Sequence, residues 1–409
     1  MDGDILRRLA GEIAMIAAQP QQAENARLYR AINALKPIRP VVLVDELPWN
    51  QLDGEGVLDL HCRDEFLRTV ETDMRRTLYK WNNCRCDMIV EPFYRLSRVI
   101  EIPRFFGMDI IERTSDEGDK TNHIISHHYD DQIPDMQSIS KLREPTIRVD
   151  DALTQRRREI LDGLFGDLLP VRVTGITSAG FFHPWDDISR LRGVQPLLYD
   201  LYDEPEMMHA LMRRYTDLSL QLLQMEEDMG LLDVPTPTVH CTAGLADDIP
   251  APEGRVTRAN IWGRGTAQIF ASVSPAMHEK FDIAYEKEFF AGFPLVYYGC
   301  CEPLHDKIDI VEKIPNVRKI SITPWADVEK AAERIGSRFV LARKPNPANV
   351  AVPVLDEALV RREIRETLDV CRQNNTPCEF VLKDISSVHY NPKNLENWAR
   401  MAMEEVLRG

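Results

Sequence analysis

Short runs of apolar residues alternate along the chain with longer segments in which apolar residues recur every three or four positions. The short runs are rich in β-branched and aromatic residues without strict alternation, which is typical of parallel strands buried on both faces. The longer segments are typical of amphipathic helices, so their order indicates repeated β–α units. The predicted strands are Val41–Val44, Met88–Val90, Val171–Thr174, Ala267–Ala271, Leu295–Tyr298, Val317–Ile322, Phe339–Ala342 and Phe380–Leu382.

The helical segments carry clear start and stop signals. Ser274 followed by Pro275 predicts an N-cap and a first helical turn, with the helix running to about residue 290. A long apolar stripe predicts a second helix over 205–229, which Gly230 ends. Asp356 predicts the cap of a later helix, on whose buried face Cys371 is expected as a core thiol.

Eight strands with helices between them predict an α/β fold, a single (β/α)8 TIM-type barrel spanning 1–409. We expect an N-terminal helical extension over 1–40 and two loop insertions, at 113–150 and 233–265. The first insertion is polar and weakly periodic, which favours a hairpin or flap. The second is rich in Pro and Gly, which is typical of a surface loop or of a segment that covers an active site.

Composition narrows the classes of function. The 409 residues carry a net charge of -15 with scattered Lys and Arg, which argues against a nucleic-acid partner. No apolar run is long enough to span a bilayer, and acidic residues occupy the start, where a signal peptide is basic. We therefore expect a cytoplasmic protein without a membrane partner. Gly-rich phosphate loops and GxSxG elbows are not found, which argues against nucleotide-driven chemistry and serine hydrolysis.

Cysteine placement gives the strongest chemical signal. The eight cysteines are too sparse for a disulfide scaffold, but Cys300 and Cys301 follow a predicted strand directly, with Glu302 beside them. Thiolate, carboxylate and imidazole ligands at a strand end suit zinc, and His240 is the best candidate for a further ligand. Because successive strand side chains point apart, we expect one cysteine to bind and the other to pack. The alternative is two small buried residues where the backbone turns.

Further candidates stand at the ends of other predicted strands, where a barrel places its active site. Lysines after apolar strands are partly desolvated and bind anions or act with a lowered pKa. The alternative for Lys383 is a simple pair with Asp384. The candidate catalytic residues are Glu91, Lys344, Lys383 and Asp384. The candidate substrate-binding residues are Trp49, Trp185, Trp262, Gln268 and Asn346.

Several stretches of sequence resemble the uroporphyrinogen decarboxylase superfamily, which includes zinc-dependent methyltransferases that act with corrinoid proteins. The matching text is RLYRAINALKPIRPVV, LRGVQPLLYDLYDEPEMMHALM, AQIFASVSPAMHEKF, the GCCE strand end and PKNLENW, covering about 27–407. The resemblance implies one (β/α)8 barrel, in agreement with the strand count.

Departures from the family pattern favour one branch of it. The arginine-bearing segment of the decarboxylases is replaced by VVLVDELPWNQL, which has no Arg. The methyltransferases' His-x-Cys-Gly motif places Cys300 on the motif cysteine and Tyr298 on the histidine, and a one-residue shift selects Cys301. Their last cysteine ligand is replaced by KDISSVH. The resemblance thus implies a zinc set rebuilt from Cys300 or Cys301, Glu302, His240 and His389.

The leading hypothesis is a corrinoid-linked, zinc-dependent methyltransferase acting on a small methylated substrate. Its corrinoid, carried on a partner protein, rests on the resemblance alone. One alternative is a metal-free lyase or decarboxylase that uses Lys383, Asp384 and Glu91 on a carboxylated substrate. Another is a non-catalytic barrel that binds a small molecule. A homodimer is left open.

Overall fold

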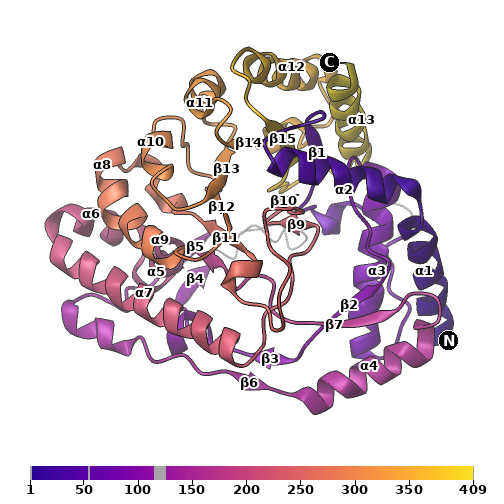
Figure 1. The fold of residues 1–409 in the computed structure, drawn as a ribbon, viewed down its shortest axis with the longest axis horizontal. Helices are drawn as coiled ribbons and strands as arrows, with labels where there is room; N and C mark the ends of the chain where they lie inside the picture. The colour runs from indigo at the N-terminus through magenta and orange to yellow at the C-terminus, as the bar shows by residue number, and fades with distance from the viewer. Residues whose placement is uncertain (1, 54–55, 115–125, 409) are drawn as a thin grey trace.

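The central feature is a seven-stranded, fully parallel sheet in a mixed α/β fold (Figure 1). The computed structural model describes residues 2–53, 56–114 and 126–408. The order of the strands across the sheet is β1 (Val41–Val44), β15 (Cys378–Leu382), β14 (Val340–Arg343), β13 (Val317–Ile322), β12 (Leu295–Tyr298), β11 (Trp262–Gly265) and β8 (Phe181–Phe182). Strands β11 to β15 are neighbours in chain order, as repeated β–α units require.

The strands are buried on both faces, as their continuous apolar runs predict. Every residue of β1, β11, β12, β14 and β15 is buried. Helices cover the outer face. They are α1 (Asp2–Ala17), α2 (Pro20–Asn33), α3 (Glu65–Cys84), α4 (Asp151–Phe165), α5 (Pro184–Arg192), α6 (Val194–Asp203), α7 (Pro205–Asp228), α8 (Pro275–His278), α9 (Ala284–Phe289), α10 (Ile308–Val311), α11 (Val328–Ile335), α12 (Glu357–Gln373) and α13 (Lys393–Arg408).

The predicted helix signals are confirmed. The Ser274 side chain accepts a hydrogen bond from the Met277 amide at the start of α8, and a π-helical turn over Glu279–Ile283 joins α8 to α9. Asp356 caps α12 through the Leu359 amide, and Cys371 is buried on that helix. Asp and Ser are strong N-caps because their oxygens satisfy amides that have no partner within the helix.

The strand predicted at Met88–Val90 is wrong. The backbone there bonds to a helix instead of to another strand, since the Met88 carbonyl accepts from Asn25 and the Val90 amide donates to Gln22. The second β–α unit uses β2 (Tyr94–Ser97), which pairs with β7 (Val171–Thr174) as a separate two-stranded parallel sheet.

The strand predicted at Ala267–Ala271 is also wrong, because the strand lies earlier, at β11. Residues Gln268–Ser272 form a 3-10 helix, η5. The glycines of β11 hid the strand, although they have a packing reason. A Cβ at Gly263 would lie 2.6 Å from the Phe290 ring, and one at Gly265 would lie 2.0 Å from Glu286. Glycine therefore lets the α8–α9 helical segment approach the sheet closely.

A closed ring of ladders is not seen among the described residues, so the barrel prediction is confirmed only as a parallel α/β sheet. The β9 (Thr238–Val239) and β10 (Thr242–Ala243) hairpin lies against the interior face of the sheet (Figure 1). The Ala243 carbonyl accepts from Lys319 of β13, and its amide donates to Glu379 of β15. The second predicted insertion thus fills interior space that a closed barrel would give to its own side chains.

The first insertion contains the expected hairpin. Strands β4 (Glu112–Thr114) and β5 (His127–Tyr129) pair antiparallel, and β3 (Ile100–Glu101) pairs with β6 (Arg148–Val149). The part of the prediction over 115–125 lies outside the described residues. The other 3-10 helices are η1 (Trp49–Gln51), η2 (Arg104–Gly107), η3 (Met136–Lys141), η4 (Arg258–Asn260) and η7 (Pro347–Asn349). In the described part of the chain, no helix has the length and apolar character needed to cross a membrane.

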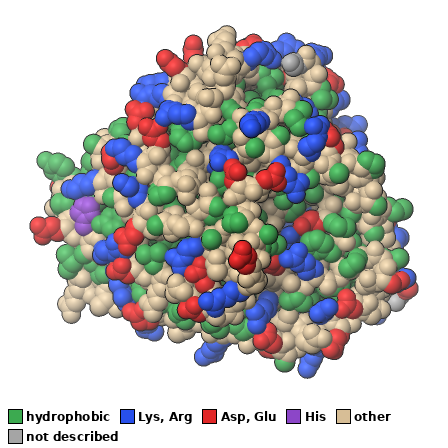
Figure 2. Space-filling view, viewed as in Figure 1, with side chains coloured by type: hydrophobic (Ala, Val, Ile, Leu, Met, Phe, Trp, Pro, Cys, Tyr) green, Lys and Arg blue, Asp and Glu red, His purple; other side chains and the backbone are tan. Residues whose placement is uncertain are grey.

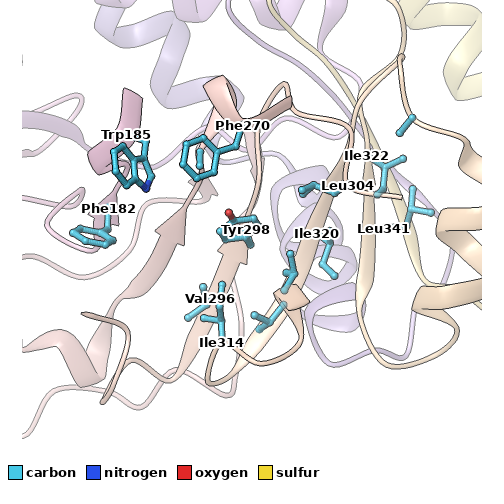
Figure 3. Close-up of a cluster of buried hydrophobic side chains, with 14 of the residues drawn as sticks. Phe182, Trp185, Phe270, Val296, Tyr298, Leu304, Ile314, Ile320, Ile322 and Leu341 are labelled. Carbon is cyan, nitrogen blue, oxygen red and sulfur yellow. The ribbon is translucent and has the colours of Figure 1, made fainter. Parts of the chain in front are cut away.

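The main core lies between the sheet and its outer helices. Figure 3 shows apolar side chains of β8, α5, η5 and β12 to β14 packed together there. Trp185 and Phe270 lie with ring centroids 5.2 Å apart, and the Trp185 indole donates to the Phe281 carbonyl. A second core joins α1, α3 and α4 to β2 and β7, and it buries Leu9, Ile13 and Ile16 of α1.

Candidate functional site

The turn after β12 fixes Cys300. Gly299 has φ 95°, which favours glycine, and a Cβ there would lie 2.4 Å from Leu304. The Cys300 amide donates to Glu302 Oε2 at 2.9 Å, and Ser321 donates to the Cys300 carbonyl at 3.0 Å. These bonds hold Cys300 buried at the carboxyl end of the sheet, while Cys301 is exposed.

Two chemically active groups from distant parts of the chain meet at the Cys300 sulfur. His240 Nε2 lies 3.5 Å from Cys300 Sγ, and Lys383 Nζ lies 3.5 Å from the same sulfur. Lys383 Nζ also lies 3.2 Å from His240 Nε2, so the ammonium donates to a neutral imidazole. The structure thus brings together Cys300, His240 and Lys383, which the sequence marked as separate candidates.

A second group of metal-binding side chains adjoins the first. One ligand atom each from Glu46, His240 and Cys241 lie within 4.8 Å of one another. The Cys241 thiol donates to Glu46 Oε1 at 3.4 Å, and Lys383 Nζ lies 3.4 Å from both Glu46 and Asp384. Glu46 is the second residue after β1 and was not among the predicted site residues, because an acid after a strand is too common to mark a site.

Left-handed backbone occurs at four residues of this cluster and at eight other non-glycine positions of the described chain. Glu46, His240, Cys241 and Asp384 all have positive φ, between 38° and 68°. Left-handed backbone at residues other than glycine is uncommon, and it gathers at functional sites where the surroundings impose it. The strain therefore marks the same residues that the side-chain geometry brings together.

The charges around Cys300 favour its thiolate. The hydrogen bond from Cys301 lowers the pKa of the Cys300 thiol to about 6, against its burial, and Lys383 and Arg264 act in the same direction. The same hydrogen bond raises the pKa of Cys301, so the exposed thiol keeps its proton. Burial and the charges of Arg264, Lys383 and Lys344 lower the pKa of His240, which keeps the imidazole neutral. Cys300 is thus the nucleophilic sulfur of the pair.

Both carboxylate oxygens of Glu302 accept hydrogen bonds from the protein. Its Oε1 accepts from the Thr266 hydroxyl at 2.8 Å and from the Ala267 amide, and its Oε2 accepts from the Cys300 amide. The side chain is fully buried. These bonds tie the end of β11 to the turn after β12, so Glu302 orients Cys300.

Two buried cations on the interior face differ from Lys383 in having no acidic partner. Lys344 follows β14 and Arg264 lies on β11, and they are 4% and 3% exposed. No carboxylate of a described residue lies within 4 Å of either, and Lys344 Nζ and Arg264 Nε have no hydrogen-bond partner. Sequence marked Lys344, but Arg264 was missed, because the lack of a partner is visible only in three dimensions.

The predicted tryptophans lie in different surroundings. Trp185 is in the outer core. Trp262 faces the interior, with its indole donating to the Gly244 carbonyl at 2.7 Å. Trp49 packs edge-on against Tyr79 and beneath Arg76, beside a separate cavity of about 570 Å³. The three side chains therefore do not form a common wall.

The remaining predicted residues have local partners. Glu91 forms a two-bond ion pair with Arg95 and lines a cavity of about 350 Å³ that also reaches Asp45 and Cys241. The Gln268 amide donates to Asp186, a half-buried acid. Desolvation raises the pKa of Asp186 to about 7, and repulsion from Glu302 adds to the effect.

Asn346 caps the short helix η7 by accepting from the Ala348 amide, and its own amide donates to Glu363. The face of the molecule in Figure 2 carries acidic and basic side chains interspersed, without a broad patch of one sign.

Comparisons with known proteins do not assign a function to this chain. No protein-family model matches the chain, and no curated protein matches it. Among solved structures, a methyltransferase from Methanosarcina mazei aligns with 93% of this chain and 97% of its own, at 14% sequence identity and a TM-score of 0.48. A likeness of this size carries no argument about function.

Proposed function

We propose that the chain is a zinc-dependent methyltransferase acting on a small methylated substrate. The observation that carries the proposal is the placement of His240 between the Cys300 thiolate and the Glu46–Cys241 pair. Soft sulfur, imidazole nitrogen and a carboxylate from three separate segments meet at the carboxyl end of a parallel sheet, where α/β proteins place their chemistry.

The donor spacing fits zinc. At ordinary Zn–S and Zn–N lengths, sulfur and nitrogen ligands of a tetrahedral ion lie about 3.5 Å apart, and sulfur and oxygen ligands lie at about the same spacing. Cys300 Sγ and His240 Nε2 lie 3.5 Å apart, and Cys241 Sγ and Glu46 Oε1 lie 3.4 Å apart. The residues proposed to hold the ion are Cys300 and His240, together with either Cys241 or Glu46. Three protein ligands leave the fourth position of the ion to the substrate.

When bound, zinc would act as a Lewis acid toward a sulfur, oxygen or nitrogen atom of the substrate. The chain's own residues prepare that position. Cys300 supplies a thiolate at neutral pH, and His240 supplies a neutral nitrogen. Lys383 compensates the thiolate charge in this structure, and Glu46 and Asp384 remain its partners when a cation lies beside Cys300. Cys301, exposed and protonated, is not included in the zinc set.

The domain organisation and the partner protein are proposed from the sequence. We propose a single barrel domain over the whole chain, in which β2 and β7 complete the ring begun by the seven-stranded sheet. The corrinoid protein that would exchange the methyl group is proposed from the sequence resemblance alone.

Metal analysis of anaerobically purified protein tests the zinc centre. We expect one zinc per chain in the wild type, loss of zinc in Cys300→Ser and His240→Ala, and retention in Cys301→Ser. Cys301→Ser is the matched control because the two cysteines are adjacent and only Cys300 contacts His240. Wild-type protein without stoichiometric metal would overturn the zinc centre.

Methyl transfer to free reduced cobalamin tests the reaction. Candidate methoxy, methylthio and methylamine compounds are supplied as donors, and methylcobalamin is followed by its absorbance. Transfer by the wild type and by Cys301→Ser, together with loss in Cys300→Ser, supports the proposal. Equal transfer by Cys300→Ser contradicts it.

A further inference from the structure

Four buried cations of the described residues lie on the interior face of the sheet, and only two of them form ion pairs with carboxylates. Lys319 Nζ lies 3.0 Å from both oxygens of Glu379, and Lys383 is flanked by Glu46, Asp384 and the Cys300 sulfur. Lys344 and Arg264 have no acidic partner among the described residues. Placing an unpaired charge in a protein interior is costly, so such groups are expected where a ligand supplies the opposite charge.

Strand geometry directs both of the other cations to the interior face. Side chains two positions apart on a strand share a face. Trp262 and Ala342 pack together in the interior core, so Arg264 and Lys344, two residues further along their strands, face the same interior. Arg264 is also paired in register with Tyr297 of β12, and Lys344 Nζ lies 5.5 Å from the centre of the Tyr297 ring.

Tyr297 adds a third donor without a partner. Its hydroxyl is buried and has no hydrogen bond, in common with Lys344 Nζ and Arg264 Nε. All three groups donate, and two of them are positively charged. Buried donors are nearly always paired in native proteins. Three such donors facing the interior suit an acceptor with several oxygens and negative charge.

The space adjoins the proposed zinc site. The His240 ring centroid lies 6.4 Å from that of Tyr297 and 6.3 Å from that of Phe181, and the Arg264 guanidinium stands 5.8 Å from the Phe181 ring. Arg264 thus lies on the strand between Phe181 and Tyr297, and Lys344 lies on the far side of Tyr297, two strands further along the sheet. Both charges act on the His240 imidazole. An oxyanion held by these cations would lie beside His240.

We propose that Lys344, Arg264 and the Tyr297 hydroxyl form an anion subsite that holds a carboxylate or sulfonate group of the substrate. The assignment of the anion to the substrate rests on the proposed function, whereas the subsite itself does not. Arg binds such groups through two parallel N–H bonds, and Lys adds a point charge. The methylated substrate is thus a small acid.

Binding to metal-free full-length protein tests the subsite separately from zinc and turnover. The probes are (methylthio)acetate, its neutral analogue (methylthio)acetamide, and sodium sulfate, each against sodium chloride at equal ionic strength. We expect the acid to bind about tenfold or more tightly than the amide by calorimetry. Sulfate and the acid are both expected to raise the melting temperature.

Variants of Lys344 test whether its charge causes the preference for acid over amide. Lys344→Met is expected to melt above the wild type, because it removes an unpaired buried charge, and to lose the preference for acid over amide. Lys344→Arg keeps the charge and is expected to keep the preference. Lys319→Met serves as the control, since it is expected to melt lower by leaving Glu379 unpaired and to retain the preference whenever it folds.

The binding results either support or overturn the anion subsite. Equal binding of acid and amide overturns it, and so does an acid preference that survives Lys344→Met. A response to sulfate without one to (methylthio)acetate identifies an adventitious ion only and also overturns it. Loss of zinc or of methyl transfer alongside retained acid binding would overturn the proposed function and leave the subsite intact.

Discussion

Adjacent tyrosines on β12 face two different environments. Tyr298 points to the helices, where its hydroxyl donates to Asp282 at 2.7 Å and lies 2.7 Å from His278 Nε2. Tyr297 points to the interior, where its hydroxyl has no partner. The helix-facing side satisfies its polar hydroxyl within the protein, whereas the interior side leaves donors open. With the proposed anion subsite, the same strand would serve stability on one face and ligand binding on the other.

The largest expected effect on the free energy of unfolding is at the core on the helix-facing side. Trp185→Ala is expected to lower the free energy of unfolding by about 3–5 kcal/mol, because it leaves a cavity in a close-packed core. Denaturant unfolding followed by circular dichroism measures it. Trp325→Ala is the control because Trp325 is 69% exposed. Equal losses in the two variants would contradict the role of the outer face.

The next prediction concerns the buried Lys319–Glu379 ion pair on the interior face. Lys319→Met is expected to cost about 3–5 kcal/mol, because it leaves the Glu379 charge buried without its partner. Lys319→Met combined with Glu379→Met is expected to recover most of that loss in the same measurement. A double variant no more stable than the single one would show that the pair does more than compensate charge.

A smaller effect concerns pH on the helix-facing side. Burial, with repulsion from Glu227, raises the pKa of Glu226 to about 7. The folded state therefore binds this proton more tightly than the unfolded state, and stability falls as the pH rises from 4.5 through about 7, by about 1–3 kcal/mol.

Glu226→Gln is expected to remove this part of the pH dependence and to be more stable than the wild type at pH 8. Glu206→Gln, at an exposed position of the same helix, is the control. Urea unfolding at pH 5 and pH 8 measures both variants. A pH dependence unchanged in Glu226→Gln would assign the titration to another group.

The smallest effect is expected at Cys301. Its side chain is exposed, so Cys301→Ser is expected to change the free energy of unfolding by less than about 0.5 kcal/mol. Cys300→Ser, in contrast, alters a buried sulfur that contacts His240 and Lys383. Thermal melts of the two metal-free variants compare them, and a larger loss in Cys301→Ser would reverse the roles of the pair.

The sequence predicted most of the sheet because buried parallel strands such as Leu295–Tyr298 and Val317–Ile322 are continuous apolar runs. It misplaced the strand at Trp262–Gly265, whose glycines reflect the close approach of Glu286 and Phe290, which no local pattern reveals. It also predicted a strand at Met88–Val90, where apolar residues bond to the side chains of α2.

The candidate site was predicted one residue at a time. Cys300, His240 and Lys383 were marked by their types and by their places at strand ends or in the long loop. Their meeting depends on the β9–β10 hairpin lying against the interior face, and periodicity carries no information about that placement. The proposed roles of Arg264 and Tyr297 rest on buried donors that have no hydrogen-bond partner. That lack of a partner can be recognised only in the folded chain.

The pairing of β1 with β15 has a consequence for how the protein is made. Lys383 and Asp384 follow the last strand of the sheet, and the Asp384 amide donates to Glu46, 338 residues earlier in the chain. During synthesis the N-terminal units can fold as they leave the ribosome, but this corner forms only after residue 384 has emerged. A chain truncated before residue 383 therefore carries Cys300 without Lys383, so the reactive sulfur acquires this partner only after Lys383 has left the ribosome.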